Sequence, residues 1–226
     1  MRLPKTATVV IVIVTSAVWL LTALIGAQDQ ASLAFGVIPA RLSGYELRIA
    51  AVPAWLTPLS STLAHGGAVH LALNMLMLVW CGTKVERVLG SGALVVLYVI
   101  GAYVAAVAQW LVDPISPIPM IGASGAISAV IGAFALTFGQ HKTIVRSPGL
   151  NRALNALWLL AAWVVLQLLT GFLAGAQGFL LATPAHIGGF LAGLLLERQL
   201  LLWRYRKDKG ADGVLSPARS CGRRWR

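Results

Sequence analysis

One serine and two histidines occupy similar positions at the starts of three apolar segments. The residues are Ser124, which lies between Gly122 and Gly125, together with His70 and His186. A serine hydroxyl that hydrogen-bonds to an imidazole is the minimal activated nucleophile, because the histidine accepts the hydroxyl proton and later returns it to the leaving group. For this chemistry to occur, the fold must bring the side chains together at one depth.

The composition is that of a membrane protein. Of the 226 residues, 58% are hydrophobic and 11% are charged, whereas a soluble domain carries roughly a quarter charged residues. Six apolar segments approach the ~20 residues that cross ~30 Å of hydrocarbon. We therefore predict an all-α polytopic membrane protein with six transmembrane helices. Their expected bounds are 7–27, 68–83, 93–112, 122–138, 153–174 and 184–203. A signal peptide is the alternative for the first segment, because Arg2 and Lys5 precede it.

The distribution of positive charge predicts the orientation. Cytoplasmic loops of membrane proteins carry an excess of Lys and Arg. With the N-terminus inside, only Arg41 and Arg48 of the 18 Lys and Arg residues fall on the outer side. The cytoplasmic set includes Lys142 and Arg146. This pattern predicts an N-in, C-in topology.

The chain is expected to form one membrane domain over residues 1–208, followed by a basic, disordered cytoplasmic tail over residues 209–226. The net charge of +11 would suggest nucleic acid as a partner in a soluble protein. Here the positive charge flanks the apolar segments on their cytoplasmic side. The expected partner is therefore the lipid bilayer, and no nucleic acid is expected.

The predicted topology places four polar side chains at one depth. The second, fourth and sixth segments all run from the outside to the inside, so their first residues lie near the outer surface. His70 and Asn74 are in the first two turns of the second segment, and Ser124 and His186 are in the first turns of the fourth and sixth. At 1.5 Å per residue, all four lie within about two turns of the same boundary.

Small residues recur every four positions in the fourth and sixth segments. Such rows allow helix backbones to approach closely. Ser124 and His186 each immediately precede a row, so close packing of the two segments would bring their side chains together. The alternative is ordinary membrane packing without a functional role. The rows are Gly125, Ala129 and Ala133, and Ala185, Gly189 and Gly193.

Two other kinds of site and one other class of protein fit the sequence less well. The soluble hydrolase elbow G-x-S-x-G is excluded, because Ala126 replaces its last glycine and no strand precedes Ser124. A metal site at His70 and His186 lacks a clear carboxylate or thiolate as a third ligand. A transporter would place polar residues near the midplane. No cofactor and no metal are therefore expected.

Three motifs on alternate segments resemble the signature of the rhomboid intramembrane serine proteases. They are Gly122-Ala-Ser124-Gly125, His65-Gly-Gly-Ala-Val-His70-Leu-Ala-Leu-Asn74-Met75 and Ala185-His186-Ile-Gly-Gly. The similarity extends over about residues 55–197. By this resemblance Ser124 is the nucleophile and His186 the general base, a dyad without an acid. His70 and Asn74 would stabilise the oxyanion with the backbone N–H of Ser124.

The resemblance also implies a function and a location. It implies cleavage of transmembrane segments of membrane proteins near the outer leaflet, with the substrate entering sideways. The expected location is a bacterial inner (plasma) membrane, with the site opening to the periplasmic or extracellular side. The alternative is a catalytically silent rhomboid-like protein that binds client helices without cutting them. The residues assigned a structural role near the site are His65, Gly122, Gly125, Ser128 and Gly189.

Two positions depart from the family pattern. Many members carry Trp-Arg in the first outer loop, whereas Trp55 is followed here by Leu56. Many members also carry an aromatic residue four positions after the nucleophile, where it packs on the catalytic histidine. This chain has Ser128 at that position, so the means of orienting His186 is left open.

Overall fold

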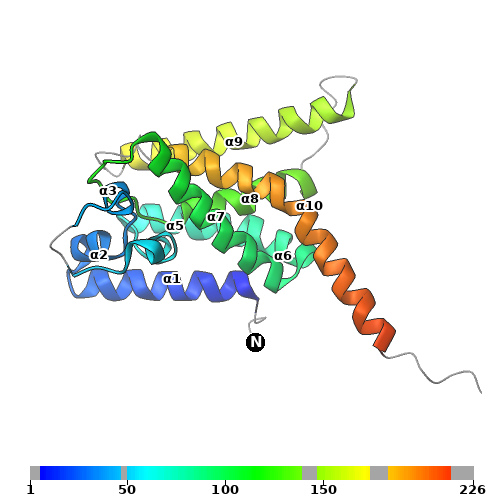
Figure 1. Cartoon of the computed structure of the whole chain (residues 1–226), viewed down its shortest axis with the longest axis horizontal. Helices are drawn as coiled ribbons and strands as arrows, with labels where there is room; N and C mark the ends of the chain where they lie inside the picture. Colours follow the sequence, from blue (N-terminus) through cyan, green and yellow to red (C-terminus); the bar gives the residue numbers. More distant parts are fainter. Residues whose placement is uncertain (1–5, 47–49, 139–146, 174–182, 215–226) are drawn as a thin grey trace, which may run out of the picture.

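The computed structural model describes residues 6–46, 50–138, 147–173 and 183–214, and these residues are helical with connecting loops (Figure 1). No strand occurs within those ranges beyond one isolated bridge between Val37 and Met120. In chain order the elements are α1 (Ala7–Leu24), α2 (Gln28–Phe35), α3 (Pro39–Leu42), η1 (Ala54–Leu56), α4 (Thr57–Ser60), η2 (Ser61–Leu63), α5 (Ala68–Met77), η3 (Leu78–Gly82), α6 (Thr83–Leu89), α7 (Ser91–Val112), α8 (Ser124–Phe138), α9 (Pro148–Leu173) and α10 (Thr183–Val214).

Five described helices are long and apolar enough to cross a membrane, and α8 is a shorter apolar helix of 15 residues. The predicted class of all-α polytopic membrane protein is confirmed. The second segment was expected to end at residue 83, but α5, the π-helical η3 and α6 form one 22-residue apolar helix that ends at Leu89. The five helices span Ala7–Leu24, Ala68–Leu89, Ser91–Val112, Pro148–Leu169 and Thr183–Arg206.

The predicted count of six spans and the N-in, C-in orientation stay predictions. Several of the charges counted for the orientation lie outside the described residues, among them Arg2, Lys5, Lys142 and Arg146 on the predicted inner side and Arg48 on the predicted outer side. The predicted boundary at residue 208 lies within α10, which continues to Val214. Residues 215–226 of the predicted tail also lie outside the described part of the chain.

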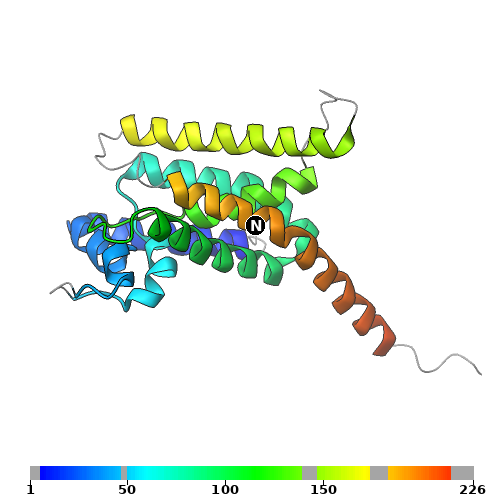
Figure 2. The same cartoon turned by 45° about the horizontal axis from the view of Figure 1, so that its top comes forward.

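Helix α8 forms the centre of the bundle, and almost all of its residues from Ser124 to Ala135 are buried. It packs closely against α10 (Figure 2). A Cβ atom at Gly193 would collide with the carbonyl of Ala129, and one at Gly132 would collide with the carbonyl of Phe190. The small residues therefore allow the two backbones to touch, which fixes how the N-terminal ends of α8 and α10 face each other.

A buried carboxylate anchors the first helix. The oxygens of Glu86 accept hydrogen bonds from the backbone N–H of Ala7 (2.6 Å), from the N–H and hydroxyl of Thr8 (3.0 and 2.6 Å) and from the hydroxyl of Ser91 (2.6 Å). The first N–H groups of a helix have no intrahelical partner, and a negative charge at that end is favourable. Glu86 therefore joins the start of α1 to the end of α6.

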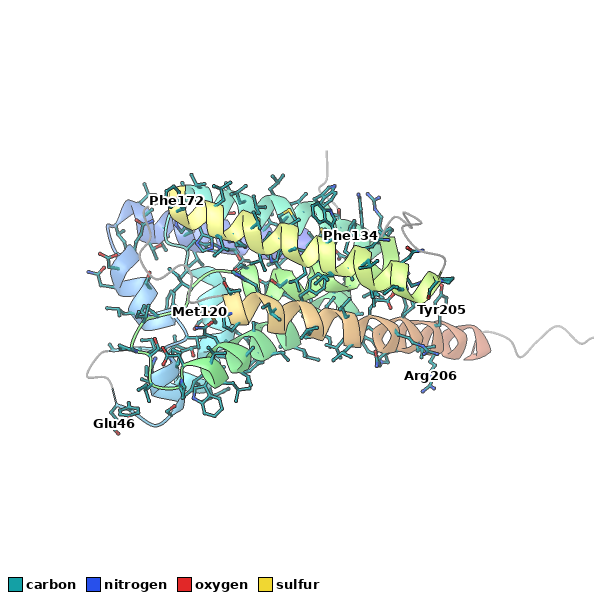
Figure 3. The ribbon with its side chains drawn as sticks, turned by 90° about the horizontal axis from the view of Figure 1, so that it is seen from above. Glu46, Met120, Phe134, Phe172, Tyr205 and Arg206 are labelled. Atoms are coloured by element: carbon teal, nitrogen blue, oxygen red, sulfur yellow. The ribbon has the colours of Figure 1, made fainter. Side chains whose placement is uncertain are left out.

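The long loop after α1 folds into short helices at the end of the bundle where α10 begins (Figure 1). Glu46 lies at this end, and Tyr205 and Arg206 lie toward the opposite end (Figure 3). Leu56 stands where many family members have an arginine after the tryptophan, but other side chains hold this loop by hydrogen bonds. The Tyr103 hydroxyl donates to the Trp55 carbonyl (3.1 Å), and Arg41 donates to the Val52 carbonyl (2.8 Å).

Candidate active site

The loop that leads into α8 is held by backbone hydrogen bonds. Met120 and Val37 exchange two such bonds, of 2.8 and 2.9 Å, and the N–H of Gly122 donates to the carbonyl of Ser61 at 2.9 Å. Because these bonds end only two residues before Ser124, they fix the position at which α8 begins. The segment of short helices between α1 and α5 thus holds the candidate nucleophile in place.

His65 supports the same loop from the segment before α5. Its Nε2 accepts a hydrogen bond from the backbone N–H of Ala123 (3.4 Å), and its carbonyl accepts one from the indole of Trp19 (3.0 Å). Burial lowers the pKa of His65 from 6.5 to about 3, so the ring is neutral near pH 7 and Nε2 can act as an acceptor. These contacts link the segment before α5 to the loop before α8 and to α1, and the structural role of His65 stays a prediction.

Ser124 and His186 meet between the N-terminal ends of α8 and α10. The hydroxyl oxygen of Ser124 lies 2.9 Å from Nε2 of His186, within hydrogen-bond distance. Both side chains are buried, with 7% and 4% of their surface exposed. A Cβ at Gly189 would collide with the carbonyl of Gly125, so this glycine allows the close approach that brings the pair together.

Gly122 makes room for the imidazole of His70. This glycine has φ +110°, a conformation that favours glycine, and a Cβ there would lie 2.8 Å from Cε1 of His70. The same Cβ would lie 3.8 Å from the hydroxyl oxygen of Ser124. The backbone at Gly122 therefore touches the His70 ring beside the candidate nucleophile.

Asn74 lies one turn after His70 on α5 and is fully buried. Its amide nitrogen donates to the His70 carbonyl at 3.0 Å, and its amide oxygen has no hydrogen-bond partner in the described part of the chain. An amide nitrogen carries two N–H groups. One of them is thus engaged within α5, which leaves the second for another acceptor.

Trp163 from α9 packs next to His186. The sequence alone did not indicate which residue would orient this histidine. The ring centroid of Trp163 lies 6.4 Å from that of His186, in an edge-to-face arrangement at 68°. Its indole N–H donates to the hydroxyl of Ser128 at 2.7 Å. Nothing in the sequence separates this tryptophan from Trp158 on the same helix, which is 75% exposed.

A pocket adjoins the Ser124–His186 pair on the side of α4 and α7. It holds about 300 Å³ of empty space, including space open to solvent. Much of its lining consists of small residues. The lining residues are Pro58, Ser61, Thr62, Ala102, Ala105, Met120, Ile121, Gly122, Ser124, Gly125, Ala126, Ala185 and His186.

Among the described residues, no group of three or more His, Cys, Asp or Glu side chains is placed to hold a metal ion. The three histidines near Ser124 are instead arranged around the start of α8. His65 and His70 contact each other edge to face, with ring centroids 5.0 Å apart, and His186 approaches from α10. The chemistry that this arrangement offers is proton transfer to and from a serine hydroxyl.

The fold and the arrangement of these residues define an integral membrane protein of the helical-bundle class. Residues 53–203 match the family model described as the Rhomboid domain. This match covers more than half of the chain, and the protein belongs to the rhomboid family.

The similar proteins include both proteases and rhomboid-like proteins. The chain is 35% identical over 138 residues to RHOMBOID-like protein 5 of Arabidopsis thaliana. The aligned stretch covers 61% of this chain and 41% of that protein. It is 30% identical over 147 residues to Rhomboid protease GluP of Bacillus subtilis, an alignment that covers 65% of this chain and 26% of GluP. It is 29% identical over 140 residues to Rhomboid protease GlpG of Pectobacterium atrosepticum, an alignment that covers 61% of this chain and 45% of GlpG. The match thus spans less than half the length of these relatives.

Proposed function

We propose that this protein is an intramembrane serine endopeptidase that cleaves transmembrane segments of membrane proteins by a Ser124–His186 dyad. The observation that carries the proposal is the 2.9 Å contact between the Ser124 hydroxyl and Nε2 of His186, both buried at the starts of adjacent helices. The family includes relatives named as proteases, which supports the reaction class.

In this mechanism the Ser124 oxygen attacks the scissile carbonyl while Nε2 of His186 accepts its proton. The negative charge that develops on the carbonyl oxygen is stabilised by backbone N–H groups at the start of α8 and by His70 and Asn74. His186 then donates its proton to the leaving amine, and the C–N bond breaks. Water, deprotonated by His186, hydrolyses the acyl-enzyme and restores the Ser124 hydroxyl.

The membrane setting restricts the substrate. Backbone carbonyls of a transmembrane helix are hydrogen-bonded within the helix, so the segment must unwind locally before Ser124 can attack it. Small or helix-breaking residues near the scissile bond favour this unwinding. The pocket beside Ser124, with Ala102, Ala105 and Gly125 in its lining, suits a small side chain. We place the cut near the outer leaflet of a bacterial inner membrane, with the site opening to the periplasmic or extracellular side.

The proposal is tested by reconstituting the purified full chain in liposomes with a model substrate. The substrate has one transmembrane segment with Ala and Gly residues in its outer half. The protease is expected to release a fragment whose new terminus lies in that half, as located by mass spectrometry. Binding of the substrate without any cleavage by the folded protein would instead support the catalytically silent alternative.

Replacing Asn74 with alanine is expected to lower kcat by about 10²-fold, with KM changed less than threefold. The reason is that an oxyanion donor acts mainly in the transition state, and loss of one such donor typically costs ~10²–10³ in rate. Asn155→Ala on α9 is the matched control, since it removes an amide from another apolar helix. An unchanged kcat in folded Asn74→Ala protein would remove Asn74 from the site.

A further inference from the structure

His186 needs a second restraint besides its contact with Ser124. A single hydrogen bond does not by itself fix the orientation of an imidazole ring, and catalysis requires Nε2 to face the serine hydroxyl when the proton is transferred. The Trp163 and His186 rings pack edge to face, with their centroids 6.4 Å apart. Only 2% of the Trp163 surface is exposed, so the indole is packed on all sides and can restrict the movement of the His186 ring.

The indole is itself held in place by α8. Its N–H donates to the Ser128 hydroxyl (2.7 Å), and that hydroxyl donates to the Ser124 carbonyl (2.7 Å). Ser128 is fully buried and lies one turn after Ser124, on the same face of the helix. A continuous path of hydrogen bonds thus connects the Trp163 ring to the backbone of the candidate nucleophile.

The three side chains come from three different helices. Ser128 belongs to α8, Trp163 to α9 and His186 to α10. Ser128 places the indole at a set height relative to Ser124, and the indole limits the rotation of the imidazole. The distance between the serine hydroxyl and Nε2 therefore depends on a residue of α9. That residue, Trp163, acts through the His186 ring and the Ser128 hydroxyl.

We propose that Trp163 is a positioning residue for His186 and that Ser128 is the acceptor that fixes the indole. The proposal rests on the dyad mechanism above and deepens it. Trp163 acts through the imidazole, so its loss should slow every reaction that requires the dyad. It should leave substrate binding nearly unchanged.

The first test compares Trp163→Leu with Trp158→Leu, which removes an exposed tryptophan from the same helix. Trp163→Leu is expected to lower kcat by about 10–100-fold with KM within about twofold, since small misplacements of catalytic groups can cost ~10²-fold. The rate of Ser124 labelling by a small fluorophosphonate probe should fall by a similar factor. Trp158→Leu should match the unmodified protein in both assays.

The second test examines the Trp163–Ser128 hydrogen bond with Trp163→Phe, Ser128→Ala and the double variant. Ser128→Ala leaves a buried indole N–H without its acceptor, which is unfavourable, whereas Trp163→Phe removes that donor. The double variant should therefore lose no more kcat than Ser128→Ala alone. If the two residues acted independently, the two losses would multiply.

The proposal is overturned if Trp163→Leu cleaves and labels within twofold of Trp158→Leu, or if only KM rises while labelling is unchanged. If Trp163→Leu does not fold, as judged by circular dichroism and thermal unfolding, the second test decides, and multiplying losses would contradict the proposal. Failure of the dyad mechanism is distinguishable, because Ser124→Ala and His186→Ala would then retain cleavage.

Discussion

Ser124→Ala is expected to abolish cleavage of a transmembrane substrate, with a rate loss on the order of 10⁴-fold or more. In the proposed mechanism this hydroxyl forms the acyl-enzyme, and it lies 2.9 Å from Nε2 of His186. The Ser124 side chain is small and its hydroxyl contacts the His186 ring, so alanine should leave the fold intact. The measurement is the initial rate of fragment release in liposomes at matched protein concentrations.

Ser32→Ala provides the control for this variant. The Ser32 hydroxyl donates to the Gln28 carbonyl within α2, so its removal should leave the rate within twofold of the unmodified protein. Cleavage by Ser124→Ala at the rate of Ser32→Ala would exclude Ser124 as the nucleophile. A folded Ser124→Ala protein that still binds the substrate would show that binding and chemistry are separable.

His186→Ala is expected to be as severe as Ser124→Ala. Without Nε2 the serine hydroxyl has no base, and the leaving amine has no proton donor. Members of a catalytic unit are not additive, so the double variant should be no slower than either single variant. The three rates are compared in the same liposome assay, with circular dichroism to verify folding.

A different outcome for the histidine would be equally informative. If His186→Ala kept more than a tenth of the rate, another group would have to accept the proton. His70 is one candidate by position, because its ring lies against Gly122, two residues before Ser124. His186→Ala combined with His70→Ala would then identify the base, and the dyad assignment would be wrong.

Composition and apolar run length were enough to predict an all-helical membrane bundle. They underestimated the second helix, because polar residues such as Lys84, Glu86 and Arg87 interrupt the apolar pattern before the helix ends at Leu89. The side chain of Glu86 is used inside the protein to cap α1, which no periodicity reveals. The short helices between residues 28 and 63 were also not predicted, since their mixed composition has no long apolar face.

The candidate site was predictable where it depends on chain order and depth. Those two features placed Ser124, His186 and His70 near one end of their helices, and the structure brings the first two within hydrogen-bond distance. Their catalytic roles stay predictions. Trp163 was not predictable, because its contact with His186 depends on how α9 is rotated about its axis. Ser128 gave the only indication, as a small residue where the family pattern has an aromatic one.

The central claim is that Ser124 is a nucleophile activated by His186, and the most direct measurement is the location of a covalent probe. The purified full chain is treated with a fluorophosphonate and digested, and the modified peptide is sequenced by mass spectrometry. One adduct is expected, on Ser124, and no adduct is expected in His186→Ala. An adduct on another serine, or equal labelling of Ser124 without His186, would contradict this claim.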